Sequence, residues 1–185
     1  MAEQKIPLAI FTDESSIAYL AGFWGYLGVE FGRPTMLIVY ADREPLVITP
    51  LMESEMVAAM TWVSDVRTWE DFGANSWGKA LSAAIGNVPS DLWIELNSIP
   101  AIVRNYLDEI YPDTALNDIS PCLGGLRMIK SNLEINVMKQ AGAIAGAMMA
   151  AAHDSLGEGL PEYESALAVI NAGSRKAAEF LTDKG

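Results

Sequence analysis

The chain has 185 residues, 51% of them hydrophobic, and it carries a formal net charge of −12 with an isoelectric point of about 4.4. This acidity argues against binding to a nucleic-acid backbone or to anionic membrane surfaces, because both need a basic patch. Cys122 is the only cysteine, which excludes an internal disulfide and is typical of a reducing compartment.

The apolar runs are too short for targeting or for a membrane span. Ile6–Phe11 is shorter than a signal-peptide core with its cleavage site. Ala141–Ala152 falls well short of the roughly 20 residues that a spanning helix needs. The sequence therefore predicts a soluble, cytoplasmic protein.

Strand and helix patterns alternate along the chain up to Gly125. Asp42-Arg43 separates two β-rich runs and predicts a hairpin, which supplies antiparallel pairing. The predicted strands are Pro7–Thr12, Thr35–Ala41, Pro45–Thr49, Ser64–Trp69, Asp91–Leu96 and Ala115–Ile119. The predicted helices run from Asp13 or Ser15 to Leu20, over Leu51–Trp62 behind Pro50, over Ser76–Ile85 before Gly86, and from Asn97 or Ser98 to Pro112.

This alternation predicts an α/β fold: a three-layer domain with a mixed, mostly parallel sheet, followed by two α-helices. The glycine-punctuated stretch Ala21–Gly32 is expected to be a loop. A second irregular stretch, from Pro121 through Gly124-Gly125, is expected to be a linker.

Ser131 and Glu134 have the Ser-x-x-Glu spacing of a capping box, which marks the start of a helix. Apolar residues then recur at helical spacing to about Ser155, and a second helix is expected from about Pro161 to Leu181. These signals predict a domain boundary over Arg127–Lys130.

Two stretches of the sequence resemble the creatinase/prolidase (Xaa-Pro dipeptidase)/aminopeptidase P family. Leu126–Ser131, with Glu134-Ile135 and Met138–Ala141 after it, resembles the entry to that family's catalytic domain. Far upstream, Tyr19–Phe23 and then Pro45–Pro50 with Glu53 resemble its N-terminal domain. The resemblance implies a family N-terminal α/β domain over residues 1–125 and the first two helices of a pita-bread catalytic domain over 126–185.

The resemblance also implies a hydrolase that acts on C–N bonds, of which this chain is the non-catalytic part. Family metallohydrolases hold two divalent metals, Mn, Co or Zn, with Asp, Asp, His, Glu and Glu, which lie downstream of the two helices. The lone histidine, His153, is expected to have a surface or packing role, and the acid pair Glu53/Glu55 a solvated one. No catalytic residue, metal ligand or cofactor is therefore assigned, and the chain alone is expected to be inactive.

Substrate contact is expected from Phe31 and Arg33. In creatinases a Phe-Gly-Arg segment supplies a Phe and an Arg to the substrate site, and Phe31-Gly32-Arg33 resembles it, with a β-run following. An arginine fork suits the carboxylate that dipeptides and creatine both carry. The alternative is that Phe31 belongs to the core and that Arg33 pairs with Glu30.

Three interpretations remain open at this point. The first is an Xaa-Pro dipeptidase; the second is a creatinase-like amidinohydrolase, which would use a His and carboxylates without metal. The third is a stand-alone, non-catalytic dimerisation or binding module. The resemblance implies a homodimer whose N-terminal domain approaches the partner's active site.

Overall fold

The computed structural model describes residues 6–25, 27–72, 76–87 and 90–181. The chain divides into two compact units, Met1–Leu126 and Arg127–Gly185.

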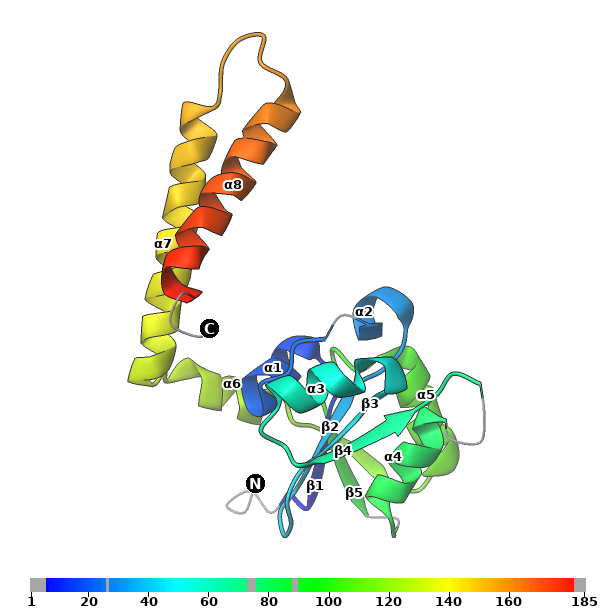
Figure 1. Ribbon diagram of the computed structural model, residues 1–185. Helices are drawn as coiled ribbons and strands as arrows, with labels where there is room; N and C mark the ends of the chain where they lie inside the picture. The colour runs from blue at the N-terminus through cyan, green and yellow to red at the C-terminus, as the bar shows by residue number, and fades with distance from the viewer. Residues whose placement is uncertain (1–5, 26, 73–75, 88–89, 182–185) are drawn as a thin grey trace. The chain divides into compact units, whose positions relative to one another are not determined.

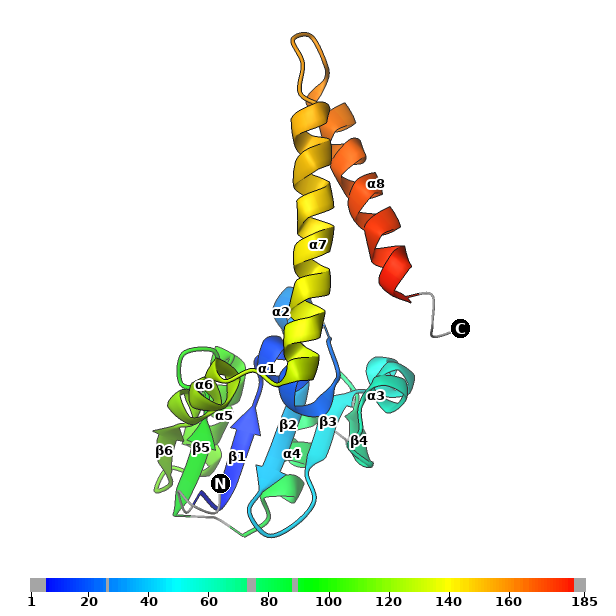
Figure 2. The same ribbon diagram turned by 90° about the vertical axis from the view of Figure 1, so that its left-hand side faces the viewer.

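The first unit is built on a six-stranded sheet with the strand order β4-β3-β2-β1-β5-β6, which is seen best in the second of the two views (Figures 1 and 2). Strand β2 runs antiparallel to both of its neighbours, while β1–β5, β5–β6 and β3–β4 are parallel pairs. The predicted mixed, mostly parallel sheet is therefore confirmed. The strands are β1 (Leu8–Phe11), β2 (Met36–Tyr40), β3 (Leu46–Pro50), β4 (Asp65–Trp69), β5 (Asp91–Ile94) and β6 (Ala115–Asp118).

Helices cover both faces of the sheet, which gives the three layers that the sequence predicts. Helices α4 and α5 pack on one face, and α1, α3 and α6 pack on the other. The helices of this unit are α1 (Glu14–Ala21), α2 (Leu27–Phe31), the 3-10 helix η2 (Leu51–Glu53), α3 (Ser54–Met60), α4 (Trp77–Ile85), α5 (Ala101–Ile110) and α6 (Ser120–Met128).

Strand β1 shows why the central strands read as continuous apolar runs. Leu8 and Ile10 belong to the core under α4 and α5, whereas Ala9 and Phe11 belong to the core on the opposite face. All four residues are buried. A strand covered on both faces has no solvated side, so polar residues do not alternate along it.

The predicted boundaries of α1 and α4 are confirmed. Asp13 begins α1, because its side chain accepts a hydrogen bond from the amide of Ser16 at 3.0 Å. Gly86 follows α4 directly. The predicted cap of α5 is wrong: Pro100 holds the N-cap position without a side-chain bond. Residues 97–98 lie in a turn instead, which the Glu95 carbonyl closes by accepting the Ser98 amide at 3.1 Å.

Two stretches expected to be irregular contain helices. Within Ala21–Gly32 lies the five-residue helix α2, and Tyr26 lies outside the described residues. The expected linker is α6, which buries Leu123 on the sheet. Asp118 supports the start of α6 by accepting the Ser120 amide at 3.0 Å. Hydrogen bonds from the Ser120 hydroxyl and amide hold the pKa of Asp118 below its usual range.

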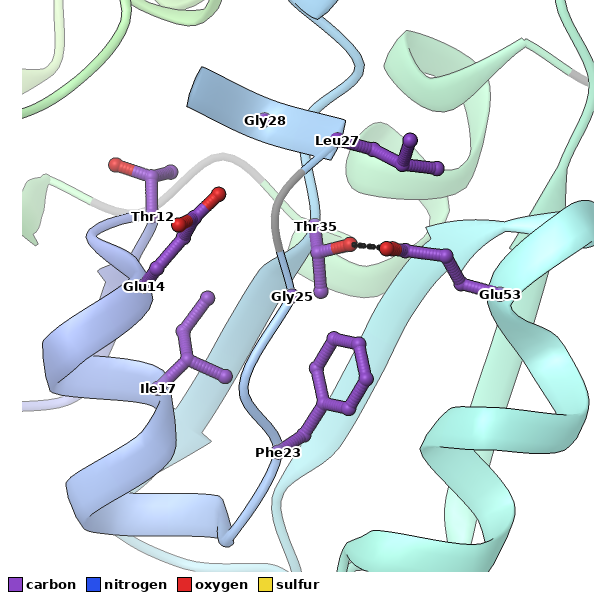
Figure 3. Close-up of a pocket in the computed structure, with 9 residues that line it drawn as sticks. All are labelled: Thr12, Glu14, Ile17, Phe23, Gly25, Leu27, Gly28, Thr35 and Glu53. Atoms are coloured by element: carbon purple, nitrogen blue, oxygen red, sulfur yellow. Dashed lines mark hydrogen bonds between the residues drawn. The ribbon is translucent and has the colours of Figure 1, made fainter. Parts of the chain in front are cut away.

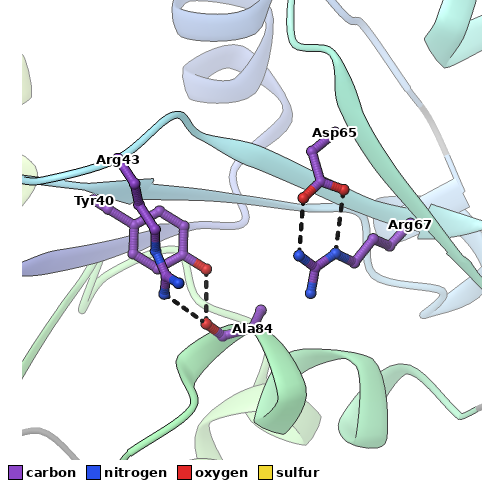
Figure 4. A network of polar contacts seen from close by, with 5 residues as sticks. All are labelled: Tyr40, Arg43, Asp65, Arg67 and Ala84. Carbon is purple, nitrogen blue, oxygen red and sulfur yellow. Dashed lines mark hydrogen bonds and ion pairs between the residues drawn. The ribbon is translucent and has the colours of Figure 1, made fainter.

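A polar network ties α4 to the sheet (Figure 4). The hydroxyl of Tyr40 on β2 donates to the Ala84 carbonyl at 2.7 Å, and Arg43 Nη2 donates to the same oxygen at 3.2 Å. The Arg43 guanidinium also lies 3.7 Å from the centre of the Tyr40 ring. Burial raises the pKa of Tyr40, and the charge of Arg43 partly opposes this rise.

The second unit is a pair of helices, α7 (Asn132–Asp154) and α8 (Glu162–Leu181), which lie side by side as a hairpin (Figures 1 and 2). The predicted capping box is present: Ser131 Oγ accepts the Glu134 amide at 3.2 Å, and Glu134 Oε2 accepts the Ser131 amide at 2.7 Å. Within the described residues, none of the helices combines the length and apolar content that crossing a membrane requires.

Candidate functional site

Three chain segments that follow or precede strands meet at one edge of the sheet. Because β2 is antiparallel to β3, the residues just before β2 lie beside the residues just after β3. Strand β4 is parallel to β3, and its last residue, Trp69, pairs with Pro50. This edge therefore brings together Arg33, Met52 and Asp71, which lie far apart in the sequence. Ligand sites are common where parallel strands end.

Arg33 lies at this edge with its guanidinium held in place. Arg33 Nε is 3.1 Å from Asp71 Oδ1, and Nη2 is 2.6 Å from Oδ2. Nη1 lies 3.6 Å from the sulfur of Met52. About a third of the Arg33 and Asp71 side chains is exposed, so the fork is accessible from solvent.

Phe31 and Gly32 show how the chain delivers Arg33 to the edge. Phe31 ends α2 and is 60% exposed, so the alternative that places it in the core is wrong. Gly32 has a φ of +63°, the left-handed conformation that glycine adopts at low cost. The Arg33 amide then donates to the Leu27 carbonyl at 3.1 Å and closes the end of α2.

The segment Phe31–Arg33 is therefore the end of a helix followed by a bend. Asp71 pairs with Arg33. The expected pairing of Arg33 with Glu30 falls on a side chain outside the described ones. The structure brings Arg33 to an accessible edge and leaves the role of Phe31 and Arg33 toward a substrate as a prediction.

A groove of about 400 Å³, named the edge groove here, is continuous with the Arg33 contacts. Met52 and Asp71 both touch Arg33 and line this groove. Its volume is within the range of small-molecule sites. Phe72, which also lines it, is 93% exposed. The groove is lined by Pro50, Leu51, Met52, Trp69, Glu70, Asp71 and Phe72.

Sequence reasoning missed the part that Met52, Asp71 and Phe72 play in this groove. The only signal was their position, since each follows the end of a predicted strand or opens the next element. Their pairing with Arg33 spans 19 residues for Met52 and 38 for Asp71, and no local pattern encodes contacts of that length.

Glu53 corrects a second expectation, because it is buried with only 4% exposure and does not lie on a solvated face. Its Oε2 accepts hydrogen bonds from Thr35 Oγ1 at 3.1 Å and from Thr49 Oγ1 at 3.3 Å. Glu55, its partner in the expected acid pair, is exposed as predicted. Glu53 ends η2, the 3-10 helix that follows β3, while Thr35 directly precedes β2 and Thr49 lies in β3.

No metal-binding group is formed by the described residues: nowhere in them do three His, Cys, Asp or Glu side chains converge. His153 is exposed, and its Nδ1 lies 3.1 Å from Asp154 Oδ1. The side chains present therefore do not fit a two-metal hydrolase centre. What the edge offers chemically is an arginine fork beside a partly apolar groove.

Comparison with known proteins places this architecture among related ones. A family model described as the creatinase/prolidase N-terminal domain matches residues 1–129. A curated creatinase from Bacillus sp. (strain B-0618) is 28% identical over 184 residues, which are 96% of this chain and 43% of the relative. The chain thus spans less than half the length of the curated relatives that it matches.

Two solved structures share the fold. A prolidase from Pyrococcus furiosus superposes with a TM-score of 0.76 and 22% identity, over 95% of this chain and 50% of the prolidase. A proline dipeptidase from Streptococcus pneumoniae superposes with a TM-score of 0.61 and 22% identity, over 70% of this chain and 92% of that chain. At this identity the likeness establishes the fold and no activity.

Proposed function

The chain belongs to the creatinase/prolidase N-terminal domain family, and on that premise we propose that it is the non-catalytic, substrate-contacting part of a hydrolase acting on C–N bonds. The observation that carries the proposal is Arg33, held at the accessible edge of the sheet beside the edge groove. A guanidinium there suits a substrate carboxylate through paired, charge-assisted hydrogen bonds.

We place the dipeptidase activity first and the creatinase-like amidinohydrolase second. The family description covers both creatinases and prolidases, so membership is compatible with either activity. The segment Phe31-Gly32-Arg33 supports the creatinase-like alternative, because it resembles the substrate-contacting segment of creatinases. A carboxylate is common to both substrates, so Arg33 serves either reaction and does not discriminate between them.

We further propose that residues 126–185 begin the pita-bread catalytic domain and that the full-length protein is a cytoplasmic homodimer. In this arrangement Arg33 acts in trans on the partner's active site. The family resemblance implies that the metal ligands of a dipeptidase lie downstream of α8. Divalent metal would there activate the water that attacks the peptide bond.

A stand-alone dimerisation or binding module is the remaining alternative. The exposed apolar side chains of α7 and α8 favour it, because an uncovered apolar surface is typical of an interface. The family relationship supports the hydrolase more strongly, since both helices fall within the stretch matched by full-length relatives.

Expression of the gene with its continuation past Gly185 tests the proposal. The purified full-length protein should release proline from an Xaa-Pro dipeptide in the presence of Mn, Co or Zn, or else release urea from creatine. The chain of residues 1–185 serves as the matched control and should turn over neither. Absence of turnover on both substrate classes, for a folded and metal-loaded full-length protein, would reject the hydrolase and favour the module.

A further inference from the structure

Among the described residues, two buried side-chain oxygens lack a hydrogen-bond partner: Thr12 Oγ1 and Glu53 Oε1. Thr12 and Glu53 both line the same small cavity, named the Glu53 cavity here (Figure 3). Buried polar atoms in folded proteins nearly always have a partner, so two such atoms around one cavity point to an occupant.

Of the two residues, Glu53 is the one whose burial without a partner costs more free energy. Its Oε2 already accepts hydrogen bonds from the hydroxyls of Thr35 and Thr49, and Figure 3 shows the carboxylate extending from η2 toward Thr35. Oε1 lies in the wall of the cavity without a donor. Removing a carboxylate oxygen from water without a donor or a cation costs much more than burying a hydroxyl.

Gly25 keeps the space beside this oxygen open. A Cβ at position 25 would stand 3.4 Å from Glu53 Oε1 and 2.9 Å from the ring of Phe23. Inside the cavity, the centre of a water-sized sphere has a volume of only about 10 Å³ available to it. Only one such body fits, which excludes amino acids and other organic ligands.

The chemistry of the wall decides which small body fits best. The polar side chains around the cavity are two carboxylates, Glu14 and Glu53, and two hydroxyls, Thr12 and Thr35. The other lining residues are apolar or glycine, and none of the nine is basic. Carboxylate and hydroxyl oxygens are good ligands for a hard cation. A divalent metal would need more acidic ligands, and the described residues contain no group of three His, Cys, Asp or Glu side chains.

We propose that the Glu53 cavity binds one monovalent cation, Na⁺, K⁺ or ammonium, with Glu53 Oε1 as its principal ligand. The cation neutralises a buried carboxylate for which the described residues provide no ion pair. This site is separate from Arg33 and does not depend on the hydrolase proposal.

The Glu53 cavity lies where a bound cation can connect the stretch before α2 to the sheet. Its walls come from α1 and from Thr12 just before it, from Thr35 just before β2 and from Glu53 at the end of η2. The remaining wall residues are Phe23, Gly25, Leu27 and Gly28. Gly25, Leu27 and Gly28 belong to the stretch that leads into α2 and on to Arg33. A bound cation therefore fastens that stretch to the sheet.

Thermal unfolding of residues 1–185 tests the site at one fixed ionic strength, in sodium, potassium, ammonium or choline chloride. Choline is too large for the cavity. In at least one small-cation salt the wild-type Tm should exceed its value in choline by about 4 °C or more and should saturate with concentration. Glu53→Gln should abolish this difference between salts.

Glu55→Gln is the matched control, because it removes the same charge from an exposed neighbour and should retain the full cation response. Crystals of the wild-type chain soaked in rubidium or thallium salts add a direct measurement that needs no variant. An anomalous peak beside Glu53 Oε1 supports the site. Equal Tm values in all four salts, or no anomalous peak in the cavity, would overturn it and leave a buried water as the occupant.

Discussion

Asp71 binds the guanidinium of Arg33 along one side, with Nε to Oδ1 at 3.1 Å and Nη2 to Oδ2 at 2.6 Å. This ion pair occupies the Nε–Nη2 edge of the fork and leaves Nη1, which contacts only Met52 among the described residues, at the other end. A guanidinium has five N–H groups, so a second carboxylate can bind the Nη1–Nη2 end while Asp71 remains in place.

Arg33→Ala should lower kcat/KM of the full-length enzyme by about 30-fold or more, because a desolvated charge pair is worth about 2–5 kcal/mol. Arg33→Lys should restore only part of the loss, since lysine cannot form paired hydrogen bonds. Steady-state kinetics on the best substrate measure both variants.

Arg67→Ala is the control for Arg33→Ala. Arg67 forms a similar two-bond pair with Asp65, with Nη2 to Oδ2 at 2.8 Å, but it lies within β4 and lines no part of the edge groove. Its removal should leave kcat/KM unchanged. Near wild-type kinetics for Arg33→Ala would show that Arg33 is a surface residue and would refute the creatinase-like interpretation of this segment.

Asp71→Asn should raise KM several-fold and change kcat little, because Asp71 orients the fork without touching the reacting atoms. The folded state should lose less than about 1 kcal/mol, since ion pairs this exposed are weak. Kinetics and urea unfolding of the same variant measure the two effects. A lower KM would mean instead that Asp71 competes with the substrate for Arg33.

Tyr40 should make the fold sensitive to alkali. Burial raises its pKa above the ordinary value of 10.0, so the folded chain holds the phenolic proton more tightly than the unfolded chain. This contribution to stability is complete below pH 10 and is lost as the pH rises through the folded pKa. Urea unfolding across alkaline pH should show the decline.

Tyr40→Phe isolates that contribution. It removes the hydrogen bond to Ala84 and should cost about 1 kcal/mol near neutral pH, while Arg43 still donates to the same carbonyl. The variant should lose less stability than wild type between neutral and strongly alkaline pH. Identical pH profiles for the two proteins would contradict the raised pKa.

Gly78→Ala should destabilise the first unit by about 1–3 kcal/mol, because a Cβ there would stand 2.6 Å from the ring of Tyr106. Tyr106 cannot easily withdraw, since its hydroxyl donates to the Gly78 carbonyl at 2.7 Å. Gly124→Ala in α6 is the matched control; its Cβ meets nothing within 4 Å. It should be neutral or stabilise by up to about 1 kcal/mol. Thermal unfolding separates the two, and equal effects would rule out the steric explanation.

Local signals in the sequence were sufficient for much of the fold. The capping box at Ser131 and Glu134 is complete within four residues, so the start of α7 could be predicted from the sequence. Helix α2 could not, because its five residues lie in a glycine-rich stretch without a cap signal and are held by the burial of Leu27.

The candidate site depends on contacts between distant segments and was therefore only partly predictable. Arg33 could be proposed from its Phe-Gly-Arg setting, but its pairing with Asp71 depends on the order of strands in the sheet. The burial of Glu53 likewise depends on Thr35, 18 residues away and directly before β2. In the sequence alone, two neighbouring acidic residues such as Glu53 and Glu55 indicate a solvated surface. Only the folded sheet shows that hydroxyl groups donate hydrogen bonds to Glu53.

The place of β1 in the middle of the sheet has a consequence for biosynthesis. One edge of β1 pairs with β2, the next strand in the sequence. The other edge pairs with β5, where Trp93 lies opposite Ala9, so it can pair only after β5 has been synthesised. At translation rates of about 5–20 residues per second, that edge stays open on the order of several seconds. During this interval the nascent chain exposes an unpaired, wholly apolar strand to other nascent chains, a template for misassembly. Synthesis of β5 therefore closes the interval in which this edge is open to wrong pairing.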